Sequence, residues 1–429
     1  MEKIETVSAE SFDVDLKHAL IWIARALDYV GVDDIHHNHR VAYIAHECAK
    51  RLNWPVKKQE FTFFAGLIHD CGVSQTNEHE DLIRELTPTH VQTHCSVGFN
   101  ALNQCRLLTK FSTIILHHHT HWERLKEIEL SPYEKDITAL IFISDRLDFL
   151  RAKHLNSNSA DLVTLHKKEI SDELNKRSGT LFRPEYVEVL CELVKKDGFW
   201  FAMEPENIES MPLHFSHLGW LKKDLSMHDL IQLGRFIAGI VDAKSPFTYQ
   251  HSLKVAELCL HLALAMHLPR PTARMLYISG LVHDIGKLRT PDDILHKPGQ
   301  LTAEEYIRIK RHTIDTEIAL QMVFPNSKIG EWASNHHEKL NGTGYPYNKS
   351  AKDLDLPSRI IAVADIFQAL SQDRPYRNRL TADEIINIMQ PMVTDKLIDD
   401  EVFQYLNNNL DDFYHMSISS DENIHPLYA

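Results

Sequence analysis

The sequence predicts an all-α protein made of two helical bundles in tandem. Apolar residues recur at helical spacing along most of the chain, and few segments alternate as a strand does. The chain also repeats itself, because its second half carries the motifs of the first half at a nearly constant offset. Each half is long enough to bury a core of its own.

The first copy opens with helices whose apolar residues share one face. Residues 16–29 carry such a face, and Gly31 ends the segment. A second helix is expected to begin at His37, and the apolar run over 61–68 leads into the first His-Asp pair. This pair lies at the end of a predicted helix, where it could face a bundle core.

The second copy is organised around the segment Gly280-Leu281-Val282-His283-Asp284-Ile285-Gly286-Lys287. Its apolar pattern predicts a buried helix over 271–283 that presents His283 and Asp284 at its C-terminal end. Gly286 is expected to let the backbone leave the helix. Neighbouring residues on a helix point about 100° apart, so further ligands for one metal must come from other helices.

These patterns set the expected domain boundaries. The first copy spans 1–203, and its last helices are expected over 160–176 and 184–196. Residues 204–225 contain two prolines and no clear periodicity, so they are expected to form a linker. The second copy spans 226–429, with one long irregular loop from Glu338 to Pro357.

Composition excludes several classes of protein. A net charge of −14 opposes binding to long nucleic acid. The longest apolar stretch is far shorter than the roughly 20 residues of a membrane helix, and the first residues carry no secretion signal. The six cysteines form no CxxC pair, which fits free thiols. We therefore expect a cytoplasmic protein without a membrane partner.

Many of the 28 histidines recur in the same order in both copies. His37 and His251 are 214 positions apart, as are His69 and His283. Loop-length changes widen the offset to 218 for the later histidines and to 220 for the last aspartate. The two repeated sets are His37, His69, Asp70, His94, His118, His119 and Asp145, and His251, His283, Asp284, His312, His336, His337 and Asp365. Because His117 is also a histidine, the register of the His118-His119 pair is open.

The second set is suited to a pair of metal ions. One group comprises His251, His283 and Asp365, and the other comprises His312, His336 and His337. Asp284 belongs to both groups, because its two carboxylate oxygens can bridge two ions. Imidazole and carboxylate ligands without thiolate favour iron or manganese over structural zinc. Two such ions can clamp a phosphoryl group.

The second copy resembles the HD-GYP family, a branch of the HD phosphohydrolases, over about residues 242–379. The similarity rests on Asp365 and on five motifs: His283-Asp284-Ile285-Gly286-Lys287, Ile294-Leu295-His296-Lys297-Pro298-Gly299, His336-His337-Glu338, Gly342-Thr343-Gly344-Tyr345-Pro346 and Arg374-Pro375-Tyr376-Arg377. The resemblance implies a phosphodiesterase that linearises 3′,5′-cyclic dinucleotides, most often cyclic di-GMP and in some members 3′3′-cyclic GMP-AMP. It also implies two or three metals, usually iron or manganese.

The resemblance assigns roles to residues at matching positions. The seven residues of the second set become metal ligands, and Asp284 and Lys287 become catalytic. Lys287 would meet the scissile phosphate and its developing charge. Arg374 and Arg377 are similar to the family's phosphate-contacting cations, and Tyr345 would lie beside the metals or a base. The GYP loop, which is the irregular loop from Glu338 to Pro357 that contains Gly344-Tyr345-Pro346, is also linked in the family with GGDEF-domain partners. The sequence leaves a homodimer open.

One departure from the family bears on the number of metals. Members with three metals carry a glutamate one turn before the first histidine, and this chain has Phe247 there. We therefore predict two metals.

The first copy has lost groups expected to hold a cyclic dinucleotide. Val73 stands where Lys287 does, and no GYP loop follows His119. Three interpretations stay open: a metal-holding but inactive fold, an empty scaffold, and a separate small phosphohydrolase site.

Two other functions compete with the cyclic dinucleotide phosphodiesterase. The chemistry of the HD motif also suits a 5′-nucleotidase or another nucleotide phosphohydrolase, including an added activity on the linear product. A signalling adaptor that binds nucleotide without turnover is the third candidate, although no ligand of the second set is degenerate.

Overall fold

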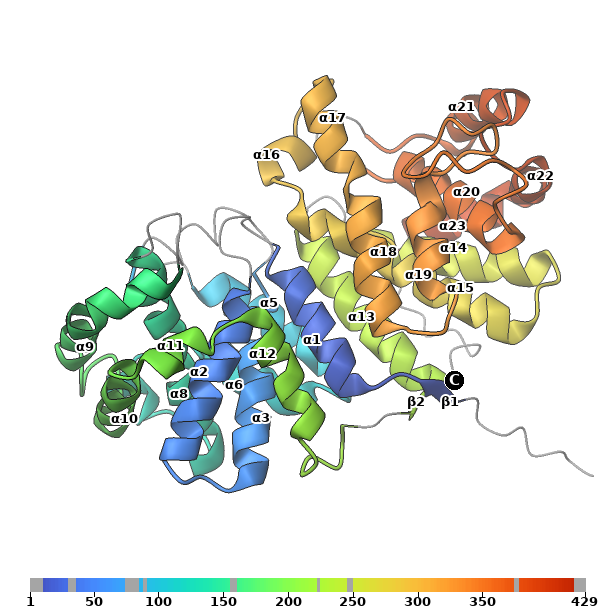
Figure 1. Ribbon diagram of the computed structural model, residues 1–429. Helices are drawn as coiled ribbons and strands as arrows, with labels where there is room; N and C mark the ends of the chain where they lie inside the picture. The colour runs from blue at the N-terminus through green and yellow to red at the C-terminus, as the bar shows by residue number, and fades with distance from the viewer. Residues whose placement is uncertain are drawn as a thin grey trace, which may run out of the picture. The chain divides into compact units, whose positions relative to one another are not determined.

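The computed structural model confirms the all-α class (Figure 1). It describes residues 11–29, 36–73, 85–87, 91–154, 160–221, 224–244, 250–373 and 378–419. Strands in these residues are limited to β1 (Ser11–Asp13) and β2 (Asp224–Ser226), which pair antiparallel with Phe12 opposite Leu225. None of the described helices combines the length and apolar character needed to cross a membrane.

The chain divides into two compact units. The N-terminal unit comprises residues 20–221, and the C-terminal unit comprises residues 1–19 together with 222–429. The first boundary differs from the predicted 1–203 domain, because β1 pairs with β2 and so belongs with the second copy. Three-residue strands carry too little periodicity to be recognised in a sequence.

The N-terminal unit consists of short helices around the long helix α8, which is buried from Ile137 to Arg151. Its α2 and α3 pack so closely that a side chain at Gly66 would lie 2.6 Å from the Ala42 Cα. The elements of this unit, which α1 enters at residue 20, are α1 (Leu16–Leu27), α2 (His37–Arg51), α3 (Val56–Leu67), α5 (Gln92–Asn103), η1 (Thr109–Phe111), α6 (Ser112–His117), α7 (Trp122–Leu125), α8 (Pro132–Lys153), η2 (Ala160–His166), α9 (Lys167–Asn175), α10 (Pro184–Val194), α11 (Asp197–Phe201), α12 (Pro205–Ser210) and η3 (Met211–His214).

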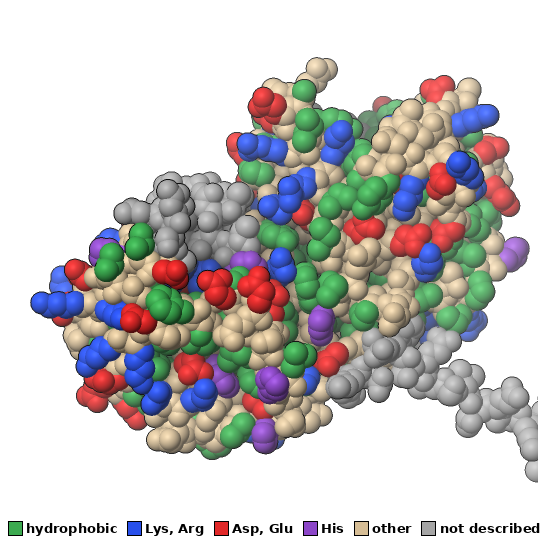
Figure 2. All heavy atoms as spheres, viewed as in Figure 1, with side chains coloured by type: hydrophobic (Ala, Val, Ile, Leu, Met, Phe, Trp, Pro, Cys, Tyr) green, Lys and Arg blue, Asp and Glu red, His purple; other side chains and the backbone are tan. Residues whose placement is uncertain are grey.

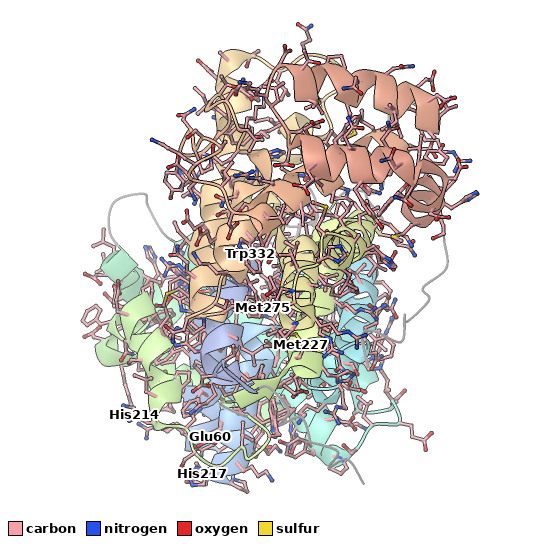
Figure 3. All side chains as sticks on the ribbon, turned by 90° about the vertical axis from the view of Figure 1, so that its right-hand side faces the viewer. Glu60, His214, His217, Met227, Met275 and Trp332 are labelled. Atoms are coloured by element: carbon pink, nitrogen blue, oxygen red, sulfur yellow. The ribbon has the colours of Figure 1, made fainter. Side chains whose placement is uncertain are left out.

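The predicted linker over 204–225 instead contains α12 and η3 and packs on this unit. Pro205 occupies the first turn of α12, where proline starts a helix instead of breaking one. The buried carboxylate of Glu60 accepts hydrogen bonds from the backbone N–H groups of Ser216 and His217 at 3.1 and 2.9 Å. Figure 3 labels Glu60 and His217, which hold the end of this segment against α3.

The C-terminal unit repeats the arrangement of the first. Gly280 of α15 meets α14 as Gly66 meets α2, since a side chain there would lie 2.7 Å from the Ala256 Cα. Besides β1 and β2, its elements are α13 (Met227–Ala243), α14 (His251–Ala265), α15 (Arg270–Val282), η4 (Ile285–Arg289), α16 (Asp292–Leu295), α17 (Ala303–Lys310), α18 (His312–Val323), α19 (Ile329–Ser334), η5 (Asn335–His337), α20 (Leu356–Ser371), α21 (Ala382–Thr394), α22 (Asp400–Asn408) and α23 (Leu410–Ile418).

The exposed surface carries both signs of charge. Figure 2 shows acidic and basic side chains interspersed over the described part of each unit on the visible face, without an extended basic patch. On this face neither sign of charge dominates over one unit.

Candidate metal centre

The structure brings the seven predicted residues of the second copy together. They come from the first residue of α14, the residues just after α15, the first residue of α18, the short helix η5 and the middle of α20. Their ligand atoms form two tight groups, His251 with His283 and Asp365, and His312 with His336 and His337. Almost all of these side chains are buried, so the groups lie inside the bundle.

Asp284 lies between the two groups, and each of its oxygens faces one of them. Oδ2 lies 3.2 Å from His283 Nε2 and 3.6 Å from His251 Nε2. Oδ1 lies 3.7 Å from both His312 Nε2 and His336 Nε2. A carboxylate placed in this way can bridge two cations.

The backbone sets the orientation of three imidazoles. In each ring Nδ1–H donates to the carbonyl three residues earlier: His283 to Gly280 at 2.7 Å, and His312 to Ile309 and His336 to Ala333 at 2.6 Å. In the neutral ring, this bond leaves Nε2 without a proton and with its lone pair available. The outer hydrogen bonds therefore prepare the rings as metal ligands.

Electrostatics also favour a cation at this place. Burial lowers the pKa of His312 to about 4 and the pKa of His337 to about 3, so both rings are neutral near pH 7. Burial opposes the charged form of His283, but the carboxylates of Asp284 and Asp365 raise its pKa to about 10. Carboxylates that draw a proton so strongly will also attract a metal ion.

Unsatisfied polar atoms show that the centre fits a metal. Among the described residues, His283 Nε2 and Asp284 Oδ1 are buried and make no hydrogen bond. Buried polar atoms without a partner are costly, and a bound ion would satisfy both. The donor set of imidazoles and carboxylates suits iron, manganese or zinc.

Lys287 lies beside this centre. Its ammonium group pairs with the carboxylate of Asp284, and its side chain is 25% exposed. The substrate-binding residues predicted at 374 and 377, and the position of Phe247, lie outside the described residues.

Comparison with known proteins gives the family. HD domain models match residues 235–402 and 34–150. The 3′3′-cGAMP-specific phosphodiesterase 1 of Vibrio cholerae is 43% identical over 408 residues, which cover 95% of each chain. The chain belongs to the HD-GYP family of cyclic dinucleotide phosphodiesterases. It is a hydrolase of cyclic dinucleotides, and it is metal-dependent, as HD phosphohydrolases are.

Two further matches extend over most of this HD-GYP protein. The 3′3′-cGAMP-specific phosphodiesterase 3 of V. cholerae is 28% identical over 93% of this chain and 84% of its own length. The crystal structure of a cyclic GMP-AMP specific phosphodiesterase of V. cholerae covers 94% of this chain and 98% of its own, with a TM-score of 0.62 and 24% identity. At this identity the structural likeness supports the tandem all-α fold.

The GYP loop covers one side of the centre. The Tyr345 ring lies 4.8 Å from the His337 ring, between centroids, and 6.4 Å from the His312 ring. The predicted position of Tyr345 beside the ligand set therefore agrees with the geometry. The loop spans about the expected residues, since regular structure resumes at α20.

Two functional contacts of this HD-GYP centre were not predicted. The side-chain oxygen of Gln368 accepts a hydrogen bond from His251 Nδ1–H. Gln368 lies three residues after Asp365 on α20, and this helical spacing could have predicted that it faces the same centre. Glu338 holds the GYP loop through both of its oxygens, to Tyr347 N at 2.7 Å and Lys349 N at 2.9 Å. The sequence gives no signal for this second contact.

Proposed function

We propose that the C-terminal unit hydrolyses 3′3′-cyclic GMP-AMP to the linear dinucleotide, using two divalent ions of iron or manganese. The observation that carries this proposal is the position of Asp284, whose two oxygens face two separate groups of imidazoles. The substrate is suggested by the relative that is 43% identical over nearly its whole length and is named as 3′3′-cGAMP-specific.

The proposed ligands divide between two ions. His251, His283 and Asp365 would hold one ion, His312, His336 and His337 would hold the other, and Asp284 would reach both. When bound, the ions supply Lewis-acid catalysis and neutralise charge on the phosphate.

Lys287 is proposed to stabilise the charge that develops on the phosphate. Its ammonium group is placed next to Asp284, and its partly exposed side chain can turn toward a substrate phosphate. Tyr345 is proposed to bind one face of the substrate, because its ring lines the same centre. Arg374 and Arg377 are proposed to bind the phosphates, as guanidinium groups suit phosphate oxygens.

A panel of substrates tests the proposal. Turnover of 3′3′-cyclic GMP-AMP, cyclic di-GMP, cyclic di-AMP and a linear dinucleotide is measured with Mn²⁺ or Fe²⁺ by chromatography of the products. We expect the highest kcat/KM on 3′3′-cyclic GMP-AMP. Equal turnover of all cyclic substrates would contradict the selectivity, and turnover of the linear dinucleotide alone would favour the nucleotidase.

Replacing Lys287 tests its role. Lys287→Met removes the charge and keeps the length of the side chain, so we expect kcat to fall roughly 10²–10³-fold, as for other lost electrostatic stabilisers. Metal content should stay unchanged. Lys328→Met is the control, because that lysine pairs with Glu331 on the surface. Full activity of Lys287→Met would refute the assignment.

The remaining expectations are also proposals. We propose a cytoplasmic enzyme, and the homodimer and the GGDEF-domain partner stay predictions. Light scattering on the purified chain tests the homodimer, and pull-down with and without changes in the GYP loop tests the partner.

A further inference from the structure

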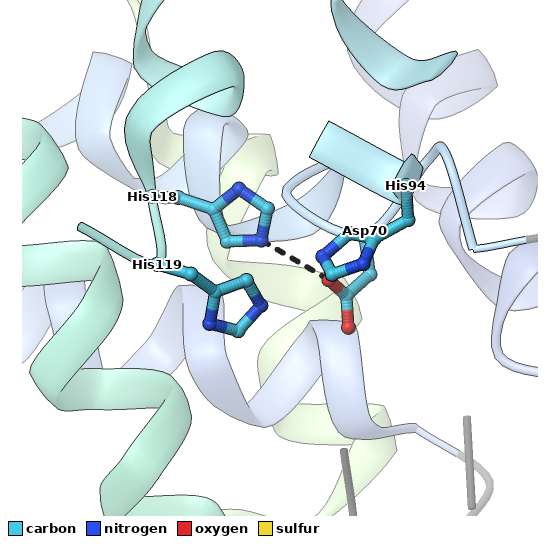
Figure 4. Close-up of side chains that lie close together, drawn as sticks. All are labelled: Asp70, His94, His118 and His119. Carbon is cyan, nitrogen blue, oxygen red and sulfur yellow. Dashed lines mark hydrogen bonds and ion pairs between the residues drawn. The ribbon is translucent and has the colours of Figure 1, made fainter. Parts of the chain in front are cut away.

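The N-terminal unit contains a second cluster of buried histidines, shown in Figure 4. Asp70 Oδ1 lies 3.3 Å from His118 Nε2 and 3.7 Å from His94 Nε2. The His119 ring lies 4.2 Å from the His118 ring and 4.9 Å from the His94 ring, between centroids. All four side chains are buried, and one ligand atom of each lies within 4.8 Å of the others.

The rings of this cluster are oriented as in the catalytic unit. His118 Nδ1–H donates to the Ile115 carbonyl at 2.6 Å, and His69 Nδ1–H donates to the Gly66 carbonyl at 2.9 Å. These bonds match those of His336 and His283, and they leave Nε2 available toward Asp70. The structure thus resolves the open register, because His118 and not His117 corresponds to His336.

Among the described residues, the His119 ring of this cluster has no hydrogen-bond partner. Both of its ring nitrogens are buried, and Nδ1 lies 3.7 Å from Asp145 Oδ2, which is beyond hydrogen-bond distance. Unpaired buried imidazoles aimed at a carboxylate are unfavourable unless a further group fills the space between them. A divalent cation would bind one of these His119 nitrogens together with His94, His118 and the Asp70 carboxylate.

The first set of ligands forms two halves around Asp70: one with His94, His118 and His119, and one with His37, His69 and Asp145. Only the second half carries a fixed positive charge. The Arg146 guanidinium binds both oxygens of Asp145, at 2.8 and 3.0 Å, and is almost completely buried. Its Nη1–H also donates to the Glu85 carbonyl at 3.0 Å, so it is fixed in place. The corresponding residue of the second copy is Ile366. A fixed positive charge on Asp145 disfavours a cation in that half.

We propose that the N-terminal unit contains a separate metal centre, in which Asp70, His94, His118 and His119 hold one divalent ion. The half that contains His37 and Asp145 stays without an ion because of Arg146. Imidazole ligands with one carboxylate suit zinc, iron or manganese. The inference does not depend on the proposed substrate, since it concerns a different unit.

Metal analysis of the full chain tests the inference. Metal per chain is measured by mass spectrometry for the wild type, the double variant His94→Gln with His118→Gln, and the matched control His117→Gln. We expect the double variant to lose one ion per chain and to keep its hydrolysis of cyclic dinucleotide, because the changed residues and the catalytic residues belong to different units. The control should lose none.

Two outcomes would overturn the inference. An unchanged metal content in the double variant would show that the cluster is empty, and the loss of two ions would show that Arg146 does not exclude the second. If circular dichroism shows that the double variant is unfolded, Asp70→Asn provides the same test, because the amide has the shape of the carboxylate. Asp284→Asn is its counterpart, and it should lose catalytic metal and hydrolysis while it keeps the N-terminal ion.

Discussion

The glycine that follows each His-Asp pair is required by space. A side chain at Gly286 would lie 2.0 Å from the His312 carbonyl oxygen, and a side chain at Gly72 would lie 1.9 Å from the His94 carbonyl oxygen. Neither glycine has a positive φ, so the predicted role of Gly286 in leaving the helix was wrong. The glycine instead lets the loop approach the helix that carries the next ligand.

Gly286→Ala should therefore disturb both stability and the metal centre. The added methyl group would overlap the backbone of α18, and overpacking of this kind costs about 1–3 kcal/mol of unfolding free energy or more. Urea denaturation measures the loss, and metal content should fall because His312 must move. Gly239→Ala in α13 is the control, since no atom lies near its new methyl group. That change should raise stability by up to about 1 kcal/mol. Equal stability of the two variants would contradict the argument.

The ligand residues were predictable because they recur in order in two copies. Contacts that single residues make across the bundle were not. Asp148 binds His37 Nδ1 at 2.8 Å, where the second copy uses Gln368 for His251. A carboxylate and an amide at equivalent positions give no common pattern, and the Arg146 contact to Asp145 resembles any neighbouring ion pair until burial is known.

At the scale of elements, one buried side chain organises the GYP loop. The two oxygens of Glu338 accept backbone N–H groups of Tyr347 and Lys349, and the side chain is 3% exposed. Because Glu338 directly follows His337, this contact links the loop to the end of the ligand helix η5. Tyr345 lies in the same loop and donates its own backbone N–H to the His337 carbonyl at 3.1 Å.

Glu338→Gln should loosen the loop without removing a ligand. An amide has one acceptor oxygen, so its NH₂ group would face a backbone N–H and one buried donor would lose its partner. We expect a loss of about 1–3 kcal/mol in unfolding free energy and a higher KM for the cyclic dinucleotide. Glu331→Gln, at a surface pair with Lys328, is the control and should change stability by less than about 0.5 kcal/mol. An unchanged KM in Glu338→Gln would show that the loop does not bind substrate.

Helices with a strong apolar pattern were predicted well. The expected helix over 271–283 is α15 (Arg270–Val282), with His283 just after its end. The expected helix over 160–176 divides into η2 and α9, which meet at His166. The segment 204–225 lacks periodicity and was predicted as a linker, but it contains α12. This helix depends on packing against α2 more than on its own apolar pattern.

At the scale of the molecule, both copies keep the backbone arrangement that positions the ligands. The side chains and the loop around the ligands differ between the copies. Both copies keep the close contact of glycine with alanine between their second and third helices, at Gly66 with Ala42 and at Gly280 with Ala256. Both keep the aspartate between two groups of histidines. They differ in the lysine and in the loop, which lie outside the ligand framework.

Chelation should affect both activity and stability. Removal of the metals by EDTA would leave buried imidazoles and carboxylates without partners, so we expect loss of hydrolysis and a lower melting temperature. A site saturated 100-fold above its Kd contributes about 2.7 kcal/mol, which corresponds to a shift of roughly 5–10 °C for units of this size. Differential scanning calorimetry measures the shift, and Mn²⁺ should reverse it. Hydrolysis that survives exhaustive chelation would contradict the metal requirement.

The pairing of β1 with β2 has a consequence for how the protein is made. The two strands are separated in the sequence by the residues of the whole N-terminal unit, yet they form one ladder. During translation β1 therefore leaves the ribosome long before its partner exists, and its backbone groups stay hydrated until residue 226 has emerged. The C-terminal unit can complete its fold only after the whole N-terminal unit, which lies between β1 and β2 in the sequence, has been synthesised.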